Sequence, residues 1–348
     1  MADKRTRVAV NGYGVIGKRV ADAIRLQPDM ELIGVADVVS DYRVQAGAVL
    51  GLPIYASLPE KVGEMKAAGI LVNGTLDDLL PQVDVVVDCT PKGIGAKNLE
   101  RYRAVGVKAI YQGGEKHSLT GHSFVAQANY ETAIGRDATR VVSCNTTSTV
   151  RTLLALRDAG LLKKARGVLI RRATDPWESD RGGIMNTMVP EKDIPSHQGP
   201  DAQTVVPDLD VVTIAAKAAH TQTHNHYWVV EMTREAGRDE VRAAFRAAPR
   251  IAFIRMADGI VALNSTIELM KDLGRPRGDM WEVALWEDVL TVNGNELYFT
   301  YQVYNEAIVV PESVDAVRAL AGTVQDGSES ICMTDEAMGM RRDFLARR

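Results

Sequence analysis

The chain has 348 residues, of which 46% are apolar and 25% charged, and its formal net charge at pH 7 is −4. At roughly 100–200 residues per domain, this length favours two domains. The lysines and arginines are scattered, which argues against a nucleic-acid partner or an anionic membrane surface, and no window approaches the roughly 20 apolar residues of a membrane span. The three cysteines lie far apart, so we expect neither a disulfide framework nor a CxxC metal site, and we predict a cytoplasmic protein.

Strand-like and helix-like segments alternate from the N-terminus to residue 143. We predict strands at 7–11, 30–37, 83–90 and 107–114, with helices at 18–26 and 95–106. The third of these strands is nearly all apolar, as expected for a strand covered on both faces. The alternation predicts an α/β domain over residues 1–143, with a parallel sheet and helices on both faces.

The pattern changes at Cys144. We predict helices at 146–160, 238–248 and 312–324, and strands at 165–174, 210–219, 224–233, 288–292 and 297–304. The sequence NGNE between the last two strands is typical of a hairpin turn. Residues 174–208 are rich in Pro, Gly, Asp and Ser, which predicts a long irregular segment. Residues 144–304 are therefore expected to form an α+β domain with a mainly antiparallel sheet.

A glycine motif stands between the first predicted strand and the first helix. Gly12, Gly14 and Gly17 form GxGxxG, in which the glycines permit a tight turn, close approach of a pyrophosphate, and close helix–strand packing. The pyrophosphate would rest on N–H groups at the start of the helix. Asp37 ends the second strand, where a carboxylate accepts the ribose hydroxyls of NAD and repels the 2′-phosphate of NADP. The motif predicts NAD binding, with NADP still open because Arg43 lies nearby in sequence.

Cys144 begins the short sequence SCNTT, directly before a predicted helix. Ser143, Asn145 and Thr146 are of the types that cap helices, and a helix N-terminus favours a thiolate. A dehydrogenase acting on an aldehyde needs such a nucleophile. Attack forms a hemithioacetal, whose carbon loses a hydride and whose oxygen needs a base. We therefore expect a histidine close to Cys144 in space.

Two histidines in the sequence THNH are the strongest candidates for that base. His224 and His226 alternate along a predicted strand, so they point to the same face. A metal site is the competing interpretation, but no third ligand stands out nearby, so acid–base chemistry is favoured. A nearby imidazolium would also favour the thiolate. Cys89 and Cys332 lack comparable surroundings and are interpreted as packing residues.

Taken together, several stretches resemble archaeal-type (type II) glyceraldehyde-3-phosphate dehydrogenase over essentially the whole chain. They are VAVNGYGVIGKRVADAI, QGGEK, VVSCNTT, VLIRRATD, PSHQGPD and VYNEAIVVPE. The resemblance implies oxidation of glyceraldehyde 3-phosphate with NAD or NADP and phosphate, giving 1,3-bisphosphoglycerate. It also implies a homotetramer, no metal, and a C-terminal segment, residues 305–348, that returns to the nucleotide-binding domain.

The resemblance also implies roles for individual residues, with Cys144 as the nucleophile and His224 as the catalytic base. It implies that the cofactor is bound by the glycine loop with Asp37 and by Val15, Ile16, Gly114, Arg172 and Asn305. The residues expected at the substrate are Ser143, Asn145, Thr146, Arg171, His197 and Gln198.

The sequence departs from the family pattern at three places. The residues before His224 are His-Thr-Gln-Thr where the family has an apolar run. Gln198 stands where the family usually has a second histidine, and residues 304–306 are Tyr-Asn-Glu where it usually has His-Gln-Glu. Two alternatives therefore stay open. One is the same cysteine mechanism acting on another small phosphorylated aldehyde or a semialdehyde. The other is a non-catalytic NAD-binding protein, against which the pairing of Cys144 with His224 argues.

Overall fold

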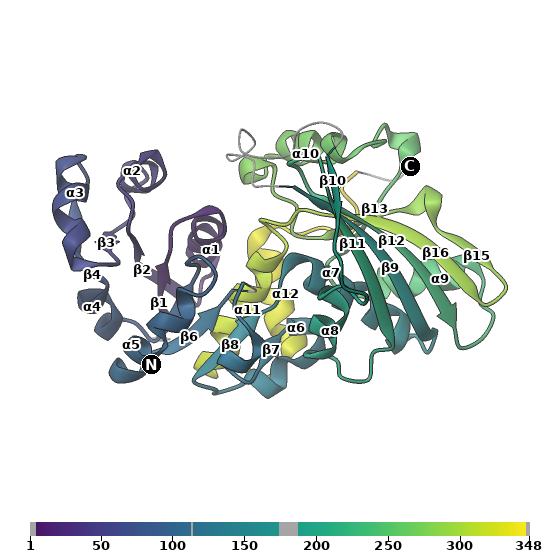
Figure 1. Cartoon of the computed structure of the whole chain (residues 1–348), viewed down its shortest axis with the longest axis horizontal. Coiled ribbons are helices and arrows are strands. Elements are labelled where there is room, and N and C mark those ends of the chain that lie inside the picture. The colour runs from purple at the N-terminus through teal and green to yellow at the C-terminus, as the bar shows by residue number, and fades with distance from the viewer. Residues whose placement is uncertain (1–4, 113, 174–186, 346–348) are drawn as a thin grey trace. The chain divides into compact units, whose positions relative to one another are not determined.

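The computed structural model of the chain describes residues 5–112, 114–173 and 187–345. It divides into two units: Met1–Ser143 with Val309–Gly339, and Cys144–Ile308 with Met340–Arg348 (Figure 1). Of the segment 305–348 that was predicted to return to the first unit, Val309–Gly339 belongs to that unit, whereas residues 305–308 and Met340–Arg348 belong to the second. The backbone N–H of Phe253 donates to the carbonyl of Arg342, and Arg246 pairs with Asp343. These contacts hold the C-terminal segment on the second unit.

The first unit is built on a sheet of eight parallel strands in the order β4-β3-β2-β1-β5-β6-β8-β7. The strands are β1 (Thr6–Asn11), β2 (Met30–Asp37), β3 (Ile54–Ala56), β4 (Val72–Thr75), β5 (Val85–Asp88), β6 (Lys108–Tyr111), β7 (Ser123–Phe124) and β8 (Ala138–Val141). The helices are α1 (Val15–Leu26), α2 (Tyr42–Val49), α3 (Val62–Ala67), α4 (Leu76–Leu79), α5 (Gly95–Val105), α6 (Ala126–Asn129), α11 (Val309–Ala321) and α12 (Gly327–Met338). This is a Rossmann-type nucleotide-binding architecture.

Burial explains why these segments form a two-sided sheet. Every residue of β5 is buried, as the apolar run predicted. Helix α11 comes from the end of the chain and packs on β8, β6, β1 and β5 (Figure 1, yellow). Its Arg318 is fully buried and donates to both carboxylate oxygens of Asp29, at 2.7 and 2.8 Å. Asp29 is 26% exposed, so the pair is only partly buried, and it ties α11 to the start of β2.

The second unit is built on a mainly antiparallel sheet in the order β10-β11-β9-β12-β16-β14-β13, with β15 paired to β16. Only the β9–β11 and β13–β14 pairs are parallel among the described strands. The strands are β9 (Leu162–Arg172), β10 (Met188–Pro190), β11 (Val211–Ala218), β12 (His224–Met232), β13 (Ile251–Ile254), β14 (Val283–Trp286), β15 (Thr291–Asn293) and β16 (Glu296–Val303). The helices are α7 (Cys144–Asp158), α8 (Gln198–Gln203), α9 (Arg238–Ala247) and α10 (Leu263–Asp272).

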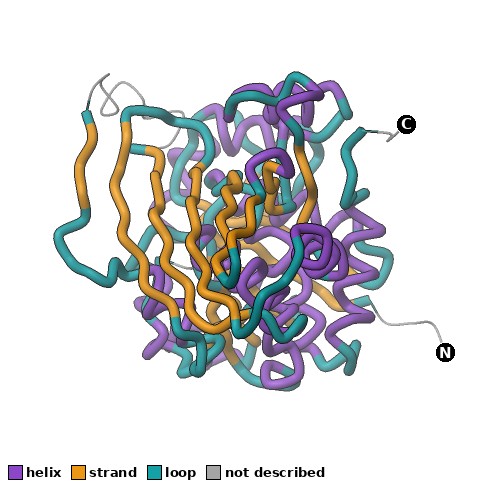
Figure 2. The backbone as a smooth tube through the Cα atoms, turned by 90° about the vertical axis from the view of Figure 1, so that its right-hand side faces the viewer, coloured by secondary structure: helices purple, strands orange, loops and turns teal. Residues whose placement is uncertain are grey.

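The two faces of this sheet differ. Helix α7 packs on β9 and β16 and contacts α8 and α9. Along β12 the side chains alternate, so that His224, His226 and Trp228 are buried, while Tyr227 is 47% exposed. Figure 2 looks onto the strands of this unit, and no helix is drawn over its long strands at the left of the view. Both histidines of the THNH sequence therefore lie on the face that α7 covers.

The sequence predicted α1, α5, α7, α9 and α11 close to their observed positions, but it missed α2, α10 and α12, which have 8, 10 and 12 residues. The hairpin is confirmed: β15 and β16 are joined through Gly294, whose φ of 60° suits the turn. Of the predicted irregular segment 174–208, residues 174–186 lie outside the described residues. The rest of the prediction is wrong at two places, because β10 pairs with β11 and residues 198–203 form α8. In the part of the chain that the structure describes, no helix is long and apolar enough to cross a membrane.

Candidate active site

The three glycines of the first loop have different environments. A Cβ on Gly12, whose φ is 93°, would lie 2.7–2.8 Å from the backbone of residues 89 and 90, and a Cβ on Gly17 would lie 1.8 Å from the carbonyl oxygen of Gly12. A Cβ on Gly14 would meet nothing within 4 Å. Gly14 also caps α1 without a side-chain hydrogen bond. The loop is therefore tight on its inner side and open beside the first turn of α1, which fits the pyrophosphate of a dinucleotide.

Asp37 links the glycine loop to the end of β2. Its Oδ2 accepts a hydrogen bond from the backbone N–H of Tyr13 at 2.6 Å, and its Oδ1 accepts from Val38 and Val39 at 2.6 and 3.2 Å. Each carboxylate oxygen has more than one lone-pair site, so the group can still accept ribose hydroxyls. Arg43 is held by Asp41 through its Nε and Nη2 atoms, which places that cation in an ion pair of its own.

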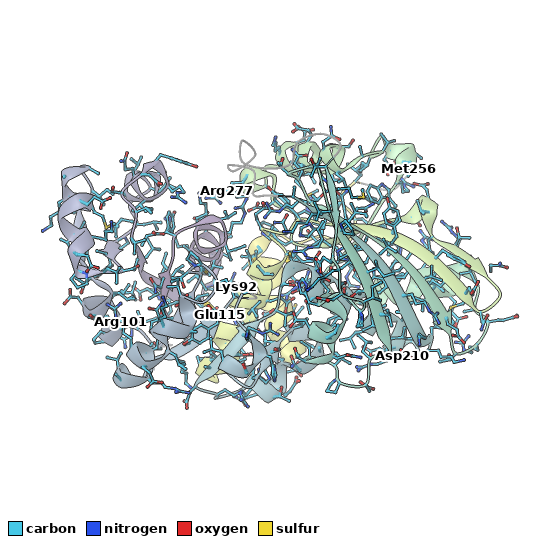
Figure 3. All side chains as sticks on the ribbon, in the orientation of Figure 1. Lys92, Arg101, Glu115, Asp210, Met256 and Arg277 are labelled. Carbon is cyan, nitrogen blue, oxygen red and sulfur yellow. The ribbon has the colours of Figure 1, made fainter. Side chains whose placement is uncertain are left out.

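The loops after β5 and β6 lie at the same edge of the sheet as the glycine loop. A Cβ on Gly114 would lie 3.4 Å from Cβ of Lys92, and the backbone N–H of Gly93 donates to Glu115 at 2.7 Å. Figure 3 labels Lys92 and Glu115 at this edge. Because the strands are parallel, their carboxyl ends meet here, where ligands bind in open α/β sheets. Gly114 is therefore placed where the sequence predicts a cofactor contact.

A buried hydrogen-bond network supports this edge, and the sequence analysis missed it. The side-chain amide of Asn11 donates to the hydroxyl of Tyr102 at 2.8 Å, and that hydroxyl donates to Oδ2 of Asp88 at 2.6 Å. The hydroxyl of Ser57 donates to Oδ1 of Asn11 at 2.7 Å. The network ties the ends of β1, β3 and β5 to α5, and it takes residues from four separate segments, so no local pattern announces it.

Cys144 and His224 are 80 residues apart in sequence and adjacent in the second unit. Cys144 is the first residue of α7, and His224 is the first residue of β12. Sγ of Cys144 lies 3.4 Å from Nε2 of His224, within the distance of a hydrogen bond to sulfur. Cys144 keeps a partly exposed surface. The predicted nucleophile is thus reachable by a small molecule and has the predicted histidine beside it.

The protonation of this pair differs from the sequence expectation of a thiolate beside an imidazolium. Burial raises the pKa of Cys144 to about 11, although the charges of Arg172 and Arg171 and the backbone N–H of Asn145 act in the opposite direction. Burial, followed by the electrostatic interaction with the neighbouring ring of His226, lowers the pKa of His224 well below its usual value. At neutral pH the ligand-free pair is therefore a thiol and a neutral imidazole. The positive charge facing the sulfur comes from arginine side chains.

The backbone of β9 fixes the tautomer of His224. The N–H of Arg172 donates to Nδ1 of His224 at 3.0 Å, so Nδ1 of the neutral ring carries no proton. The ring proton then sits on Nε2, the atom that faces Sγ of Cys144. The guanidinium of Arg172 is 3.5 Å from the carboxylate of Glu306, and both side chains are largely buried. Arg172 therefore orients the histidine through its backbone and places a cation near Cys144 through its side chain.

His226 has a different set of partners from His224. Its Nε2 lies 2.8 Å from Oδ1 of Asn145, and its Nδ1 lies 3.0 Å from the hydroxyl of Tyr301. An amide oxygen only accepts, so Nε2 carries the proton and Nδ1 accepts from the tyrosine. Burial lowers the pKa of His226 to about 3, with a further contribution from Arg171. This neutral ring holds the side chain of Asn145, the residue after the nucleophile, and lies farther along β12 from Cys144.

Among the residues expected at the substrate, Thr146 contacts α8, and three others gather around one carboxylate. The hydroxyl of Thr146 donates to Asp201 at 2.7 Å, which joins the first turn of α7 to α8. Arg171, His197 and Gln198 all contact the carboxylate of one residue that the sequence analysis did not single out, Glu191. Ser143 is the last residue of the first unit and directly precedes Cys144.

Asn305 is the remaining position predicted to bind the cofactor. It is buried, and no group among the described residues hydrogen-bonds to its Oδ1 atom. A buried amide oxygen that accepts no hydrogen bond suits an N–H donor, such as the carboxamide of a nicotinamide. Among the residues that the structure describes, no group of three or more His, Cys, Asp or Glu side chains is arranged to hold a metal ion.

Comparisons with known proteins agree with the two-unit architecture. Residues 143–276 match the family model of the glyceraldehyde 3-phosphate dehydrogenase C-terminal domain, and residues 6–113 match that of the dihydrodipicolinate reductase N-terminus. The chain is 44% identical over 335 residues to the glyceraldehyde-3-phosphate dehydrogenase of Methanobacterium bryantii, covering 96% of this chain and 99% of the relative. The enzymes of the same name from Methanothermus fervidus and Methanococcoides burtonii are also 44% identical, over 96% and 97% of this chain and 98% and 99% of theirs.

Proposed function

Because the chain belongs to the archaeal-type glyceraldehyde-3-phosphate dehydrogenase family, we propose that it converts glyceraldehyde 3-phosphate, inorganic phosphate and NAD(P) to 1,3-bisphosphoglycerate and NAD(P)H. The observation that carries this proposal is the 3.4 Å contact between Cys144 and His224 at the buried face of the second sheet. The open glycine loop and Asp37 in the first unit supply a matching dinucleotide site.

In the first half-reaction, the thiol of Cys144 releases its proton to water. The resulting thiolate adds to the aldehyde carbon and forms a hemithioacetal whose oxygen is negatively charged. Arg172 and Arg171 favour the thiolate, since both lower the pKa of Cys144. His224 in its observed tautomer donates Nε2–H to the developing oxyanion. His224 can accept a proton at Nδ1 only if the hydrogen bond from the backbone N–H of Arg172 to Nδ1 is broken. A nicotinamide dinucleotide held by the glycine loop and Asp37 would supply the hydride acceptor, and loss of the hydride lets the electron pair on oxygen close the thioester carbonyl.

In the second half-reaction, an oxygen of inorganic phosphate attacks the thioester carbon. The C–S bond breaks, Cys144 leaves as thiolate, and the product is an acyl phosphate. Both the substrate and the attacking phosphate are anions, so the site needs cations away from the reacting carbon. Arg171 and His197, which lie near each other through Glu191, are the residues we assign to that task.

The same proposal extends to cofactor preference, location and assembly. The carboxylate of Asp37 at the end of β2 supports NAD over NADP. A cytoplasmic location suits an enzyme that depends on a reduced thiol. The uncovered face of the second sheet carries Val168, Ile214 and Tyr227, each 44–47% exposed, around a groove of about 330 Å³. An apolar sheet face of this kind supports a homotetramer in which this face meets that of another copy.

A spectrophotometric assay tests the proposed function. Purified enzyme with glyceraldehyde 3-phosphate, NAD and phosphate is expected to form NADH, and omission of phosphate is expected to stop turnover after one equivalent per site. Succinate and aspartate semialdehydes serve as comparison substrates, since Gln198 and Asn305 depart from the family pattern. Preferential oxidation of a semialdehyde, or sustained turnover without phosphate, would contradict the proposal.

A further inference from the structure

The carboxylate of Glu191 contacts both Arg171 and His197, the residues that we assign to phosphate binding. The Glu191 cluster consists of Arg171, Glu191, His197 and Gln198. Nη1 of Arg171 donates to Oε1 of Glu191, Nδ1 of His197 lies 3.2 Å from Oε2, and the Gln198 amide lies 3.5 Å from Oε1. The side chains of Arg171 and Glu191 are each about one-fifth exposed. Both oxygens of the carboxylate are thus in use, one by the guanidinium of Arg171 and the other by the ring of His197.

The backbone around Glu191 is fixed independently of its side chain. Its N–H donates to the carbonyl of Ala215 at 2.8 Å, and the N–H of Ser196 donates to Thr213 at 2.7 Å. Both acceptors lie in β11, and β11 pairs directly with the end of β9 that carries Arg171. The carboxylate can therefore leave Arg171 by rotation about its own side-chain bonds, while the strands keep their pairing.

The charges of the cluster make it an anion site that already holds an anion. Burial acts to raise the pKa of Glu191, but the charges of Arg171 and His197 outweigh it and the pKa is lowered. Glu191 is therefore ionised at neutral pH. Gln198 is fully buried, and its Oε1 atom accepts no hydrogen bond from any described residue. Its Nε2 group, which lies 3.5 Å from Glu191, becomes available to an incoming anion when the carboxylate of Glu191 leaves.

We propose that Glu191 is a specificity-determining residue whose carboxylate occupies the anion position between Arg171 and His197 and is displaced when a phosphate group binds. This inference rests on the proposed function, because it takes phosphate as the incoming anion. A phosphate competes with an internal carboxylate that is tethered beside Arg171, so phosphate binds more weakly than it would to Arg171 and His197 without Glu191. A neutral molecule of similar shape gains nothing from displacing Glu191, and the competition therefore selects for phosphorylated ligands.

Substitution of Glu191 by glutamine tests the proposal, because glutamine keeps the size of the side chain and removes its charge. Inorganic phosphate is titrated into the full-length enzyme without substrate by calorimetry. We expect the dissociation constant of phosphate to fall about 10-fold in Glu191→Gln, the effect of about 1.4 kcal/mol of relieved competition. The KM for phosphate is expected to fall in the same direction. Glu191→Asp keeps the charge on a shorter side chain and is expected to give a smaller decrease.

A matched control separates this effect from a general change in surface charge. Glu231 lies on β12 and accepts from Nζ of Lys163 at 2.6 Å, so it is also a glutamate in an ion pair with a cation of β9. Glu231→Gln is expected to leave the dissociation constant of phosphate unchanged. Equal or weaker phosphate binding by Glu191→Gln would overturn the proposal, because it would show that Glu191 holds Arg171 in place for phosphate. A similar gain in the Glu231 variant would overturn it as well.

The binding measurement also separates this inference from the proposed function. Phosphate affinity is measured without turnover, so it can rise in Glu191→Gln even if glyceraldehyde 3-phosphate proves not to be the substrate. In that case the reaction assignment fails and the role of Glu191 stands. If the wild-type enzyme oxidises glyceraldehyde 3-phosphate and Glu191→Gln binds phosphate no more tightly, the reaction stands and the role of Glu191 fails. Glu191→Asp provides the same readout if the glutamine variant does not fold.

Discussion

The nucleotide loop of the first unit and the cysteine site of the second are built in opposite ways. The loop depends on backbone shape: Gly12 and Gly17 fill positions where a Cβ would collide with other backbone atoms, and Asp37 is held by N–H groups. The cysteine site depends on the side chains of Cys144 in α7 and His224 in β12 and on the backbone of β9, which orients the histidine. Burial sets the protonation of the cysteine and the histidine. A site of the first kind is visible in the sequence as spacing, whereas a site of the second kind exists only after folding.

Removal of the nucleophile is expected to produce the largest difference between the two sites. Cys144→Ser should lower turnover by at least about 10⁴-fold, because a hydroxyl does not ionise near neutral pH and loss of a nucleophile has effects of this size or larger. NAD binding, measured by calorimetry, should stay within about twofold of the wild type, since the dinucleotide loop is unchanged. Cys332→Ser is the control, since this cysteine is exposed. Retention of activity by Cys144→Ser would contradict the nucleophile assignment.

Removal of the histidine beside the sulfur is expected to have the next largest effect. His224→Asn should lower turnover by about 10²–10³-fold, the usual cost of losing one donor to an oxyanion. His226→Asn removes the partner of Asn145 rather than the group that faces Cys144, so its effect should be smaller. Steady-state turnover and the binding of NAD are measured for both variants. If His226→Asn were the more damaged of the two, the assignment of His224 as the group facing the substrate would be wrong.

The sequence predicted the positions of Cys144 and the two histidines better than their protonation states. The placement of Cys144 at the start of a helix and of two histidines on one strand face followed from local spacing. The prediction of a thiolate–imidazolium pair was wrong, because the pKa values depend on desolvation by all the residues that pack around α7 and β12. Tyr301 and Glu191 were missed for the same reason: each is defined by partners 75 and 20 residues away. Short strands such as β3 and β10 form through pairing with neighbours and carry little pattern of their own.

The reactivity of Cys144 with iodoacetamide should distinguish burial from charge pairing. Since the pKa of Cys144 is raised to about 11, the thiolate fraction, and with it the alkylation rate, should keep rising as the pH is raised from 7 to 10. Arg172→Gln removes a charge that lowers this pKa, so it should slow alkylation of the free enzyme at pH 8 by about 3- to 10-fold. Mass spectrometry locates the label. A rate that reaches a plateau near pH 7 would indicate an ion pair with His224 in the free enzyme.

An effect of similar size is expected on the choice between NAD and NADP. Asp37→Asn keeps an oxygen that can accept from the N–H of Tyr13, and it removes the negative charge that would repel a 2′-phosphate. The ratio of kcat/KM for NADP to that for NAD should rise by about 10-fold, a change of about 1.4 kcal/mol. Asp77→Asn is a suitable control, because Asp77 pairs with Arg101 and is largely exposed. An unchanged ratio in Asp37→Asn would mean that the carboxylate only holds the loop in shape. The preference would then have to arise elsewhere on the nucleotide-binding edge, beginning with Arg43, which Asp41 holds in an ion pair.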